Sequence, residues 1–277
     1  MSQETWMITG ASRGFGRAFA EYAVSQGYNV VATARRQESL SDLVALAPDQ
    51  VLAVDLDVTK PDTIDAARDL ALNRFGSIDV LINNAGYGTV GAVEETPEEE
   101  LRALFETNFF GAVAVTRSML PQMRAQRSGA VVNISSMGGQ MSMPGFGPYS
   151  ATKFALEGIS EALRGELEPF GVKVMIVEPG AFRTDFAGEA LRHMPKIDAY
   201  QSVVGGTREF SKGMDGTQAG DPKLAAQAVG QALKAEVVPL RLVLGTDAYE
   251  AVKAHAEALL EDMDNWKDTS LSVEYAR

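Results

Sequence analysis

A tyrosine and a lysine that are four residues apart, Tyr149 and Lys153, are side chains whose chemistry could be coupled. On a helix, positions i and i+4 share a face, so the phenol and the ammonium would point into one pocket. A free tyrosine has a pKa of about 10 and exchanges protons poorly near neutral pH. A neighbouring ammonium stabilises the phenolate, and lowering that pKa to about 7 requires roughly 4 kcal/mol. The pair therefore predicts acid–base chemistry at a tyrosine.

The same spacing occurs again at Tyr249 and Lys253, so spacing alone does not identify a site. The first pair follows Ser136, which lies thirteen residues before Tyr149 at the end of an apolar run. No glycine-rich turn or serine-bearing strand precedes the second pair in the same way. We therefore expect the second pair to lie on an ordinary amphipathic helix surface.

A glycine-rich stretch near the start of the chain could hold a phosphate group. Residues 9–16 read Thr-Gly-Ala-Ser-Arg-Gly-Phe-Gly, between an apolar run at 6–9 and an amphipathic stretch at 14–26. Glycines at such a turn let the backbone approach a pyrophosphate, whose charge the following helix N-terminus stabilises. A glycine-rich turn that binds nothing is the alternative, which its place at the start of an α/β chain disfavours.

The elements that must position these residues alternate along the chain. Short apolar runs predict strands at residues 6–9, 29–34, 51–55, 80–83, 130–135, 173–178 and 240–244. Amphipathic stretches predict helices at residues 14–26, 38–46, 59–75, 96–124, 149–168, 222–235 and 249–263. At two of these starts, Thr59 and Thr96 are each followed by a proline and read as N-caps.

This alternation predicts an α/β protein with one doubly wound (Rossmann) domain over residues 1–277. Its seven-stranded, mostly parallel sheet would carry helices on both faces. Residues 181–221 contain six glycines and show little periodicity, so we expect an irregular substrate lid there. Residues 246–277 are expected to form a C-terminal helix and tail.

Composition excludes several classes of function. The formal net charge of −12 argues against nucleic acid or an anionic membrane as a partner. The chain has no cysteine, which excludes disulfides, thiolate catalysis and zinc sites built from cysteines. His193 and His255 lack paired-ligand spacing, so we expect no metal. No apolar run approaches the length of a membrane span and no signal peptide is evident, which predicts a cytoplasmic protein.

Taken in order, the motifs resemble those of the short-chain dehydrogenase/reductase family. The resemblance rests on Thr-Gly-x-x-x-Gly-x-Gly at 9–16, Asn-Asn-Ala-Gly at 83–86 and Tyr-x-x-x-Lys at 149–153. The resemblance implies hydride transfer between a nicotinamide and a carbonyl or secondary alcohol. Within the family, the chain is similar to bacterial hydroxysteroid and retinol dehydrogenase-like members. The catalytic residues implied by the resemblance are Asn108, Ser136, Tyr149 and Lys153.

Each of these residues has a role in the family. Tyr149 would be the proton donor, and Ser136 would hold the substrate oxygen. Lys153 would bind the nicotinamide ribose and tune Tyr149. Asn108 would perturb its helix and hold a water that passes protons to the lysine. An asparagine within a helix is otherwise a surface residue or a mild helix defect.

Cofactor contacts are implied by the resemblance along the carboxyl edge of the predicted sheet. They are Gly10, Ser12, Arg13, Gly14, Phe15, Gly16, Arg35, Arg36, Asp57, Val58, Asn84, Ala85, Gly86, Tyr149, Lys153, Pro179, Gly180 and Thr184. An NAD enzyme usually has an acidic residue after the second strand, but Ala34 stands there. Arg13 and Arg35 would suit a 2′-phosphate, so we expect NADP(H) rather than NAD(H).

The substrate pocket is expected to be apolar and nearly free of charge. Its predicted residues are Tyr87, Gln140, Met141, Met143, Phe146, Phe182 and Phe186, to which the lid could add Met194 and Tyr200. This set predicts a medium-sized apolar ketone, aldehyde or alcohol. The family also implies a homodimer or homotetramer.

Two other functions stay open at this point. The chain could bind NADP as a catalytically silent redox sensor or regulatory subunit, although such a protein has no chemical need for Ser136, Tyr149 and Lys153. Dehydratases and epimerases on related folds usually have a different glycine spacing and a larger substrate domain.

Overall fold

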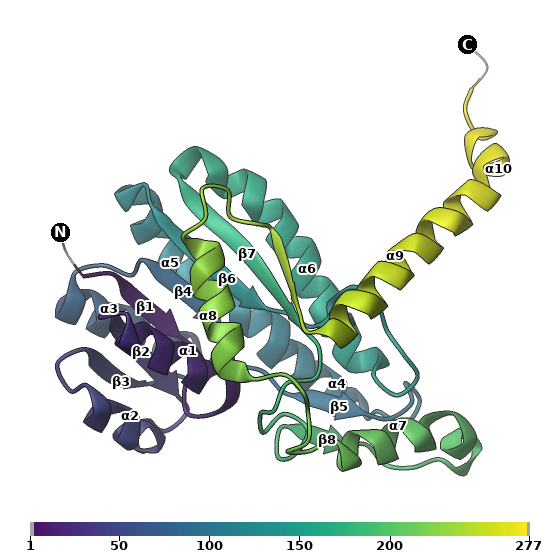
Figure 1. Ribbon diagram of the computed structural model, residues 1–277, viewed down its shortest axis with the longest axis horizontal. Helices are drawn as coiled ribbons and strands as arrows, with labels where there is room; N and C mark the ends of the chain where they lie inside the picture. Colours follow the sequence, from purple (N-terminus) through teal and green to yellow (C-terminus); the bar gives the residue numbers. More distant parts are fainter. Residues whose placement is uncertain (1–2, 276–277) are drawn as a thin grey trace.

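The computed structural model describes residues 3–275 and contains a central sheet of seven strands, all of them parallel (Figure 1). The strand order is β3-β2-β1-β4-β6-β7-β9, so the chain reverses its direction of progress between β1 and β4. The strands are β1 Thr5–Ile8, β2 Asn29–Ala34, β3 Val51–Asp55, β4 Val80–Asn83, β6 Gly129–Ile134, β7 Val172–Pro179 and β9 Arg241–Leu244. The predicted doubly wound fold is confirmed.

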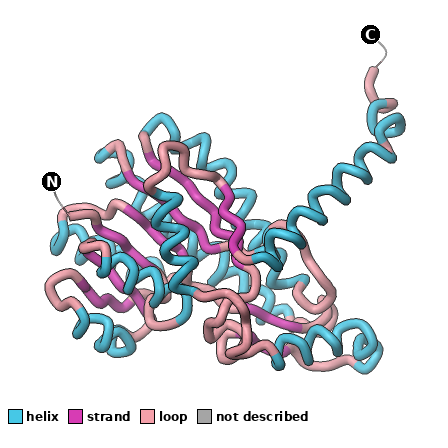
Figure 2. The backbone as a smooth tube through the Cα atoms, viewed as in Figure 1, coloured by secondary structure: helices cyan, strands magenta, loops and turns pink. Residues whose placement is uncertain are grey.

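Helices cover both faces of this sheet (Figures 1 and 2). The α-helices of the described residues are α1 Gly14–Ser25, α2 Ser41–Leu46, α3 Pro61–Phe75, α4 Glu98–Phe105, α5 Ala112–Gln126, α6 Gly147–Leu167, α7 Gln201–Gly213, α8 Pro222–Leu233, α9 Thr246–Asn265 and α10 Lys267–Leu271. One core packs α1, α2 and α8 on the sheet, and the other packs α3, α5 and α6. Along β1, Trp6 and Ile8 enter the first core and Met7 the second, the alternation that a strand imposes.

The segment predicted to be irregular, residues 181–221, contains regular structure. Its strand β8, Leu191–His193, pairs in parallel with β5, Gly88–Val90, and helix α7 follows (Figure 1). The Arg208 guanidinium donates to the Glu95 carboxylate at 2.7 Å, and both side chains are buried. This ion pair fixes α7 to the chain that follows β5, so the expectation of a structureless loop is wrong.

Two predicted helix caps are also wrong. The Thr96 hydroxyl donates to the Ala92 carbonyl at 3.2 Å, and α4 begins two residues later. The Thr59 hydroxyl donates to the Asp57 carboxylate at 2.7 Å instead of capping α3, although Pro61 occupies the first helical position as predicted. Both helices begin later than the pattern predicted, after Lys60 and Pro97, and neither N-terminus receives a side-chain cap from the described residues.

The C-terminal helix α9 leaves the sheet and projects away from the rest of the protein (Figure 1). Its far half carries exposed apolar side chains, among them Leu260, Met263 and Trp266. Within the described residues, no helix combines the length and the apolar character needed to cross a membrane.

Candidate active site

The turn between β1 and α1 requires its glycines. Gly10 and Gly14 have φ angles of +67° and +55°, a region that other residues rarely adopt. A Cβ on Gly16 would lie 2.2 Å from the Gly10 carbonyl oxygen, so only glycine fits where the turn closes on the helix. The sequence motif therefore builds a tight turn that exposes backbone before α1.

This turn fits the pyrophosphate of a dinucleotide. No side chain in the described residues caps the N-terminus of α1, and its first turn contains no acidic residue. The backbone N–H groups and the positive end of the helix dipole are therefore available to an anion. Thr184 lies over the turn, since a Cβ on Gly14 would be 3.3 Å from the Thr184 Cβ.

The Asn-Asn-Ala-Gly segment at the end of β4 is joined to this turn. The Asn84 amide donates to the carbonyls of Thr9 and Gly10, at 2.9 and 3.1 Å. The Thr9 hydroxyl accepts the backbone N–H groups of Asn84 and Ala85. Asn84 therefore holds the backbone of the glycine-rich turn in place. These bonds join the ends of β1 and β4, the two strands between which the strand order reverses.

Asn108 lies in a π-helical segment, Glu106–Gly111, between α4 and α5. Its amide oxygen accepts the Tyr87 N–H at 3.1 Å, and its amide nitrogen donates to the Tyr87 carbonyl at 2.9 Å. The same nitrogen donates to the Thr152 hydroxyl at 3.2 Å. Asn108 thus ties the strand β5 region to α6, one residue from Lys153.

The residues Ser136, Tyr149 and Lys153 come together at the carboxyl end of β6. The side chains of Tyr149 and Lys153 are nearly buried, with residue exposures of 8% and 6%. The Lys153 ammonium donates to the Ile134 carbonyl at 2.8 Å and lies 5.8 Å from the centroid of the Tyr149 ring. Ser136 accepts the Gly138 N–H at 3.0 Å, and its hydroxyl lies near the Tyr149 ring, since a Cβ on Gly138 would be 3.4 Å from the Ser136 Oγ and 3.5 Å from the Tyr149 Cε1.

Burial dominates the titration of both groups. It raises the pKa of Tyr149 to about 12, and the hydrogen bond with Ser136 only partly opposes this. Burial also lowers the pKa of Lys153 to about 8, against the attraction of Glu157. The protein alone therefore keeps the phenol neutral, in contrast to the lowered tyrosine pKa that the sequence suggested.

An aromatic frame surrounds the Tyr149 ring. The rings of Phe186 and Phe146 lie with centroids 5.4 and 6.3 Å from it. Phe186 also packs on β5, because a Cβ on Gly88 would lie 2.6 Å from its ring. Two of the predicted pocket residues are thus beside the phenol.

Methionines and Tyr87 complete the predicted pocket at its outer side. Met141 is half-buried and Met143 is exposed, both in the chain between β6 and α6. The Arg192 guanidinium lies 4.1 Å over the Tyr87 ring, so this part of the site is not free of charge. Burial raises the pKa of Tyr87 to about 12, and the nearby Glu100 adds to this shift.

Four predicted pocket residues lie elsewhere. The Phe182 ring packs on Phe15, 5.1 Å between centroids, beside the glycine-rich turn. Gln140 donates to the Glu178 carboxylate at 2.9 Å, behind the phenol. Met194 is buried against Gly91, and Tyr200 is half-buried and donates to Glu94. Long-range packing that the local sequence does not encode decides these positions.

The arginines predicted to bind a 2′-phosphate lie at the surface. Arg13 forms an exposed ion pair with Glu189, which lies in the segment after β7. Arg35 and Arg36 follow β2 and are exposed, without an ion pair to any described residue. Ala34, in the position where an NAD enzyme usually has a carboxylate, is buried.

The remaining predicted cofactor residues are less open to a ligand. The Asp57 carboxylate accepts the backbone N–H and the hydroxyl of Thr59, and Val58 is buried in the second core. β7 ends at Pro179, and the Gly180 N–H donates to the Leu244 carbonyl at 2.9 Å. At the same edge of the sheet, Ser12 is half-buried and Gly86 is exposed.

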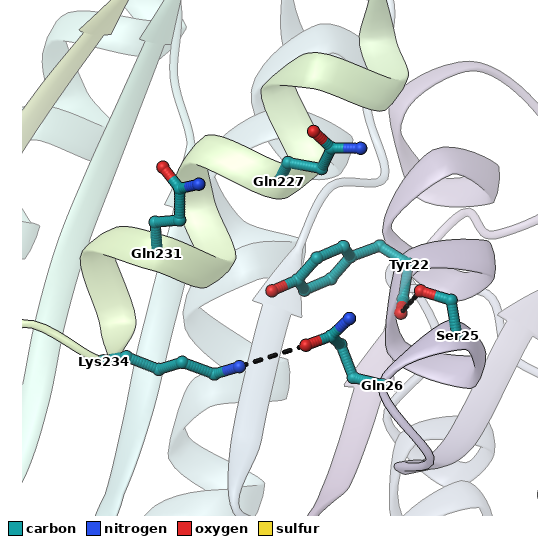
Figure 3. Close-up of a pocket in the computed structure, with 6 residues that line it drawn as sticks. All are labelled: Tyr22, Ser25, Gln26, Gln227, Gln231 and Lys234. Atoms are coloured by element: carbon teal, nitrogen blue, oxygen red, sulfur yellow. Dashed lines mark hydrogen bonds between the residues drawn. The ribbon is translucent and has the colours of Figure 1, made fainter.

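A polar cavity of about 300 Å³ lies between α1 and α8, away from these residues (Figure 3). It is lined by Tyr22, Ser25, Gln26, Gln227, Gln231 and Lys234. Lys234 donates to the Gln26 amide oxygen at 3.1 Å across it. This cavity faces the C-terminal end of α1, opposite the glycine-rich turn. Within the described part of the chain, no group of acidic and histidine side chains is arranged to hold a metal ion.

Sequence reasoning missed the buried polar side chains behind the site. The Asn83 amide donates at 2.8 Å to Asn133 on β6 and to Thr116 on α5. It also missed Glu157 and Glu178, although Glu157 lies four residues after Lys153 and so on the same helix face. That spacing is the one signal in the sequence that could have found them.

Comparison with known proteins agrees with this geometry. The family described as short chain dehydrogenase matches residues 4–195. An oxidoreductase of Botryotinia fuckeliana is 38% identical over 96% of this chain and 98% of its own. A short-chain dehydrogenase from Streptomyces avermitilis has 50% identity and a TM-score of 0.94, covering 99% of both chains. A short chain dehydrogenase/reductase from Burkholderia phymatum, solved in complex with NAD, has 26% identity and a TM-score of 0.82 over 94% of this chain and 95% of its own.

Proposed function

Because the chain belongs to the short-chain dehydrogenase family of oxidoreductases, we propose that it transfers a hydride between NADP(H) and a carbonyl or secondary alcohol. The observation that carries this proposal is the meeting of Ser136, Tyr149 and Lys153 at the carboxyl end of β6. Ligands of open parallel sheets bind outside the carboxyl ends of the strands, where the strand order reverses. The glycine-rich turn opens at that edge.

The residues divide the chemistry between them. A bound nicotinamide supplies or accepts the hydride. In the reduction direction, Tyr149 donates its proton to the carbonyl oxygen while Ser136 holds that oxygen by a hydrogen bond. Because burial favours the neutral phenol, Tyr149 carries this proton at neutral pH. Lys153, with a pKa of about 8, is mostly protonated there, and its charge stabilises the phenolate left behind.

The preference for NADP(H) rests on charge at the end of β2. Arg35 is exposed and follows the buried Ala34, so this corner offers a guanidinium where NAD enzymes offer a carboxylate. Arg13 is the second candidate and would have to leave Glu189. An exposed ion pair contributes only about 0–1 kcal/mol, so this exchange costs little. The alternative is a preference for NAD(H), because the Burkholderia relative was solved in complex with NAD. The experiment must distinguish between the two cofactors.

The substrate would be a medium-sized, apolar carbonyl compound or alcohol. Phe146 and Phe186 flank the phenol with apolar faces, and Met141 and Met143 follow at the open side. Residues 181–221 would form a lid over this pocket, and the buried Arg208–Glu95 pair would anchor α7 of that lid to the residues after β5.

A homo-oligomer is part of the same proposal. A groove of about 290 Å³ lies between α5 and α6, and its apolar residues include Leu120, Ile159 and Leu163. The same two helices from a second copy could cover it, with one patch meeting itself across a twofold axis.

The experiment is a turnover assay that follows NADPH absorbance with a panel of ketones and aldehydes, with NADH in parallel. We expect turnover with NADPH on bulky apolar carbonyls and a loss of about a hundred- to ten-thousandfold in Tyr149→Phe. The matched control is Tyr249→Phe, which should leave turnover unchanged.

Three outcomes would change the proposal. Tight NADPH binding without turnover on any carbonyl would favour a redox sensor. A clear preference for NADH would overturn the assignment of Arg13 and Arg35. Turnover of phosphate esters alone would exclude the apolar substrate.

A further inference from the structure

Behind the Tyr149–Lys153 pair, two glutamates from neighbouring elements share a buried space. Glu157 lies on α6, four residues after Lys153, and Glu178 lies on β7, just before Pro179. Both are buried, and Glu178 has no exposed surface. The two carboxyl groups converge on the same nitrogen of Gln140, whose amide donates to Glu157 at 3.4 Å and to Glu178 at 2.9 Å. The sequence gives no separate signal for Glu178.

The groups around this carboxyl pair do not supply enough positive charge for two carboxylates. The Arg241 guanidinium on β9 lies 3.1 Å from a Glu157 oxygen and 3.5 Å from a Glu178 oxygen. It is also shared with the exposed Glu161 at 2.8 Å. Lys153 on α6 is the other cation that acts on Glu157. From the turn after β6, the neutral Gln140 amide donates to Glu178 at 2.9 Å.

Each glutamate of the pair has one buried oxygen without a hydrogen-bond partner among the described residues, Oε1 of Glu157 and Oε2 of Glu178. A buried unpaired acceptor is costly, and two ionised carboxylates in contact repel each other. One proton held by the two groups would leave a single negative charge and remove the repulsion. The directions of titration agree, since burial raises the pKa of both groups and brings that of Glu178 to about 7.

The location of the carboxyl pair connects it to the catalytic residues. Gln140 ends the turn in which Ser136 accepts the Gly138 N–H, so Glu178 holds that turn through Gln140. Ser135, the neighbour of Ser136, is buried beside Glu157, since a Cβ on Gly139 would lie 2.5 Å from the Ser135 Oγ and 3.0 Å from the Glu157 Oε1. Glu157 therefore contacts the strand end that bears Ser136 and places a negative charge near Lys153.

We propose that Glu157 and Glu178 hold one proton between them, with Glu178 neutral and Glu157 ionised, as a positioning pair behind the active site. Glu178 and Gln140 fix the turn that presents Ser136. Glu157 keeps the ammonium of Lys153 protonated. The role in catalysis rests on the proposed function, whereas the shared proton does not.

The shared proton is tested first by stability, without any substrate. The folded protein holds the Glu178 proton from pH about 4.5, the ordinary value, up to about 7, whereas the unfolded chain has lost it. The folded state then binds more protons, so the free energy of unfolding should fall as pH rises through this range. In Glu178→Gln the free energy of unfolding should fall less steeply with pH, by the contribution of one titrating proton. Glutamine resembles the neutral carboxyl group and does not titrate.

Two further variants keep the stability test decisive. Arg241→Gln removes the positive charge that faces both carboxyl groups, so the folded protein should keep the shared proton to higher pH. The fall in the free energy of unfolding should then extend to higher pH. This variant keeps the test possible even if Glu178→Gln does not fold. Glu257→Gln is the matched control, four residues after Lys253 on α9, and should leave the slope as in the wild type. A slope that persists unchanged in Glu178→Gln, or is unmoved by Arg241→Gln, would overturn the shared proton.

The link to catalysis is tested by the pH profile of kcat/KM. Glu157→Gln should move the alkaline loss of activity to lower pH by about one unit, because Lys153 loses its negative neighbour. Glu257→Gln should not move it, and an unmoved profile in Glu157→Gln would contradict the positioning role. A wild type without turnover but with the predicted stability slope would instead refute the proposed function and leave the shared proton in place.

Discussion

Two helices of this protein carry the same pattern and differ in almost everything around it. On α6 the pattern is Tyr149, Lys153 and Glu157, and on α9 it is Tyr249, Lys253 and Glu257. The tyrosine is 8% exposed on α6 and 61% exposed on α9.

The two lysines show the same contrast. Lys153 is buried and donates to the Ile134 carbonyl at 2.8 Å. Lys253 is exposed and faces Glu257 at 3.7 Å, an ordinary i,i+4 surface pair. The spacing sets which side chains share a helix face, but it is burial that raises the pKa of Tyr149 and lowers that of Lys153.

The largest expected effect comes from removing each lysine in turn. Lys153→Met should reduce turnover by about a thousandfold, because it removes both the ammonium that stabilises the phenolate and a group expected to orient the cofactor. Lys253→Met should match the wild type. Steady-state assays of the two variants side by side check this, and a similar loss in both would show that burial is not what separates the helices.

A smaller loss of turnover is expected when Ser136, which lies near Tyr149 and has no counterpart near Tyr249 among the described residues, is replaced. Ser136→Ala should lower kcat by about a hundredfold, since it removes one hydrogen bond to the developing charge on the substrate oxygen. The control is Ser272→Ala beyond α10, where the hydroxyl donates only to the Thr269 carbonyl. If the two alanine variants were equally active, Ser136 would be a turn former and not part of the site.

The third expected effect is a change in stability with pH, which should leave turnover at neutral pH out of the comparison. The pKa of Lys153 is about 8 in the folded protein against 10.5 ordinarily, so the unfolded chain binds more protons between these values. The free energy of unfolding should therefore rise with pH over this range, by up to about 3 kcal/mol. Urea titrations of Lys153→Met should lack this rise, and those of Lys253→Met should keep it. A rise retained in Lys153→Met would mean that Lys153 is not the buried cation.

Much of the fold follows from local pattern. The seven strands lie within one residue of their predicted bounds, because runs such as those of β2 and β6 are buried on both faces and read as continuous apolar segments. The predicted helix α3 likewise ends at Phe75, before a glycine with positive φ. Local chemistry is enough for these elements.

The region after β7 does not follow in the same way. Helix α7 contains Gly205 and Gly206, which weaken its helical signal, and β5 and β8 are each three residues long. Their stability comes from long-range contacts such as that between Arg208 and Glu95, which are 113 residues apart. No window of sequence contains both partners.

The candidate site shows the same division. Motif order brought Ser136, Tyr149 and Lys153 together correctly as a cluster. Gln140 and Phe182 were placed in the pocket by their position in the chain, but their side chains turn to Glu178 and Phe15. Side-chain direction after a strand end depends on which partner is nearest in space, and the sequence does not state it.

The most direct test of the central claim, that surroundings and not spacing make Tyr149 the proton donor, is the ultraviolet absorbance of tyrosine phenolate as pH is raised. Wild type, Tyr149→Phe and Tyr249→Phe would be titrated with and without NADP⁺. Without it, we predict no Tyr149 phenolate at the ordinary pKa of about 10, because burial raises the pKa of this group to about 12.

With saturating NADP⁺, the positive nicotinamide should bring a phenolate signal to lower pH in the wild type and in Tyr249→Phe, and not in Tyr149→Phe. A Tyr149 phenolate that forms near pH 10 without cofactor, or an NADP⁺-dependent signal that survives in Tyr149→Phe, would contradict the account.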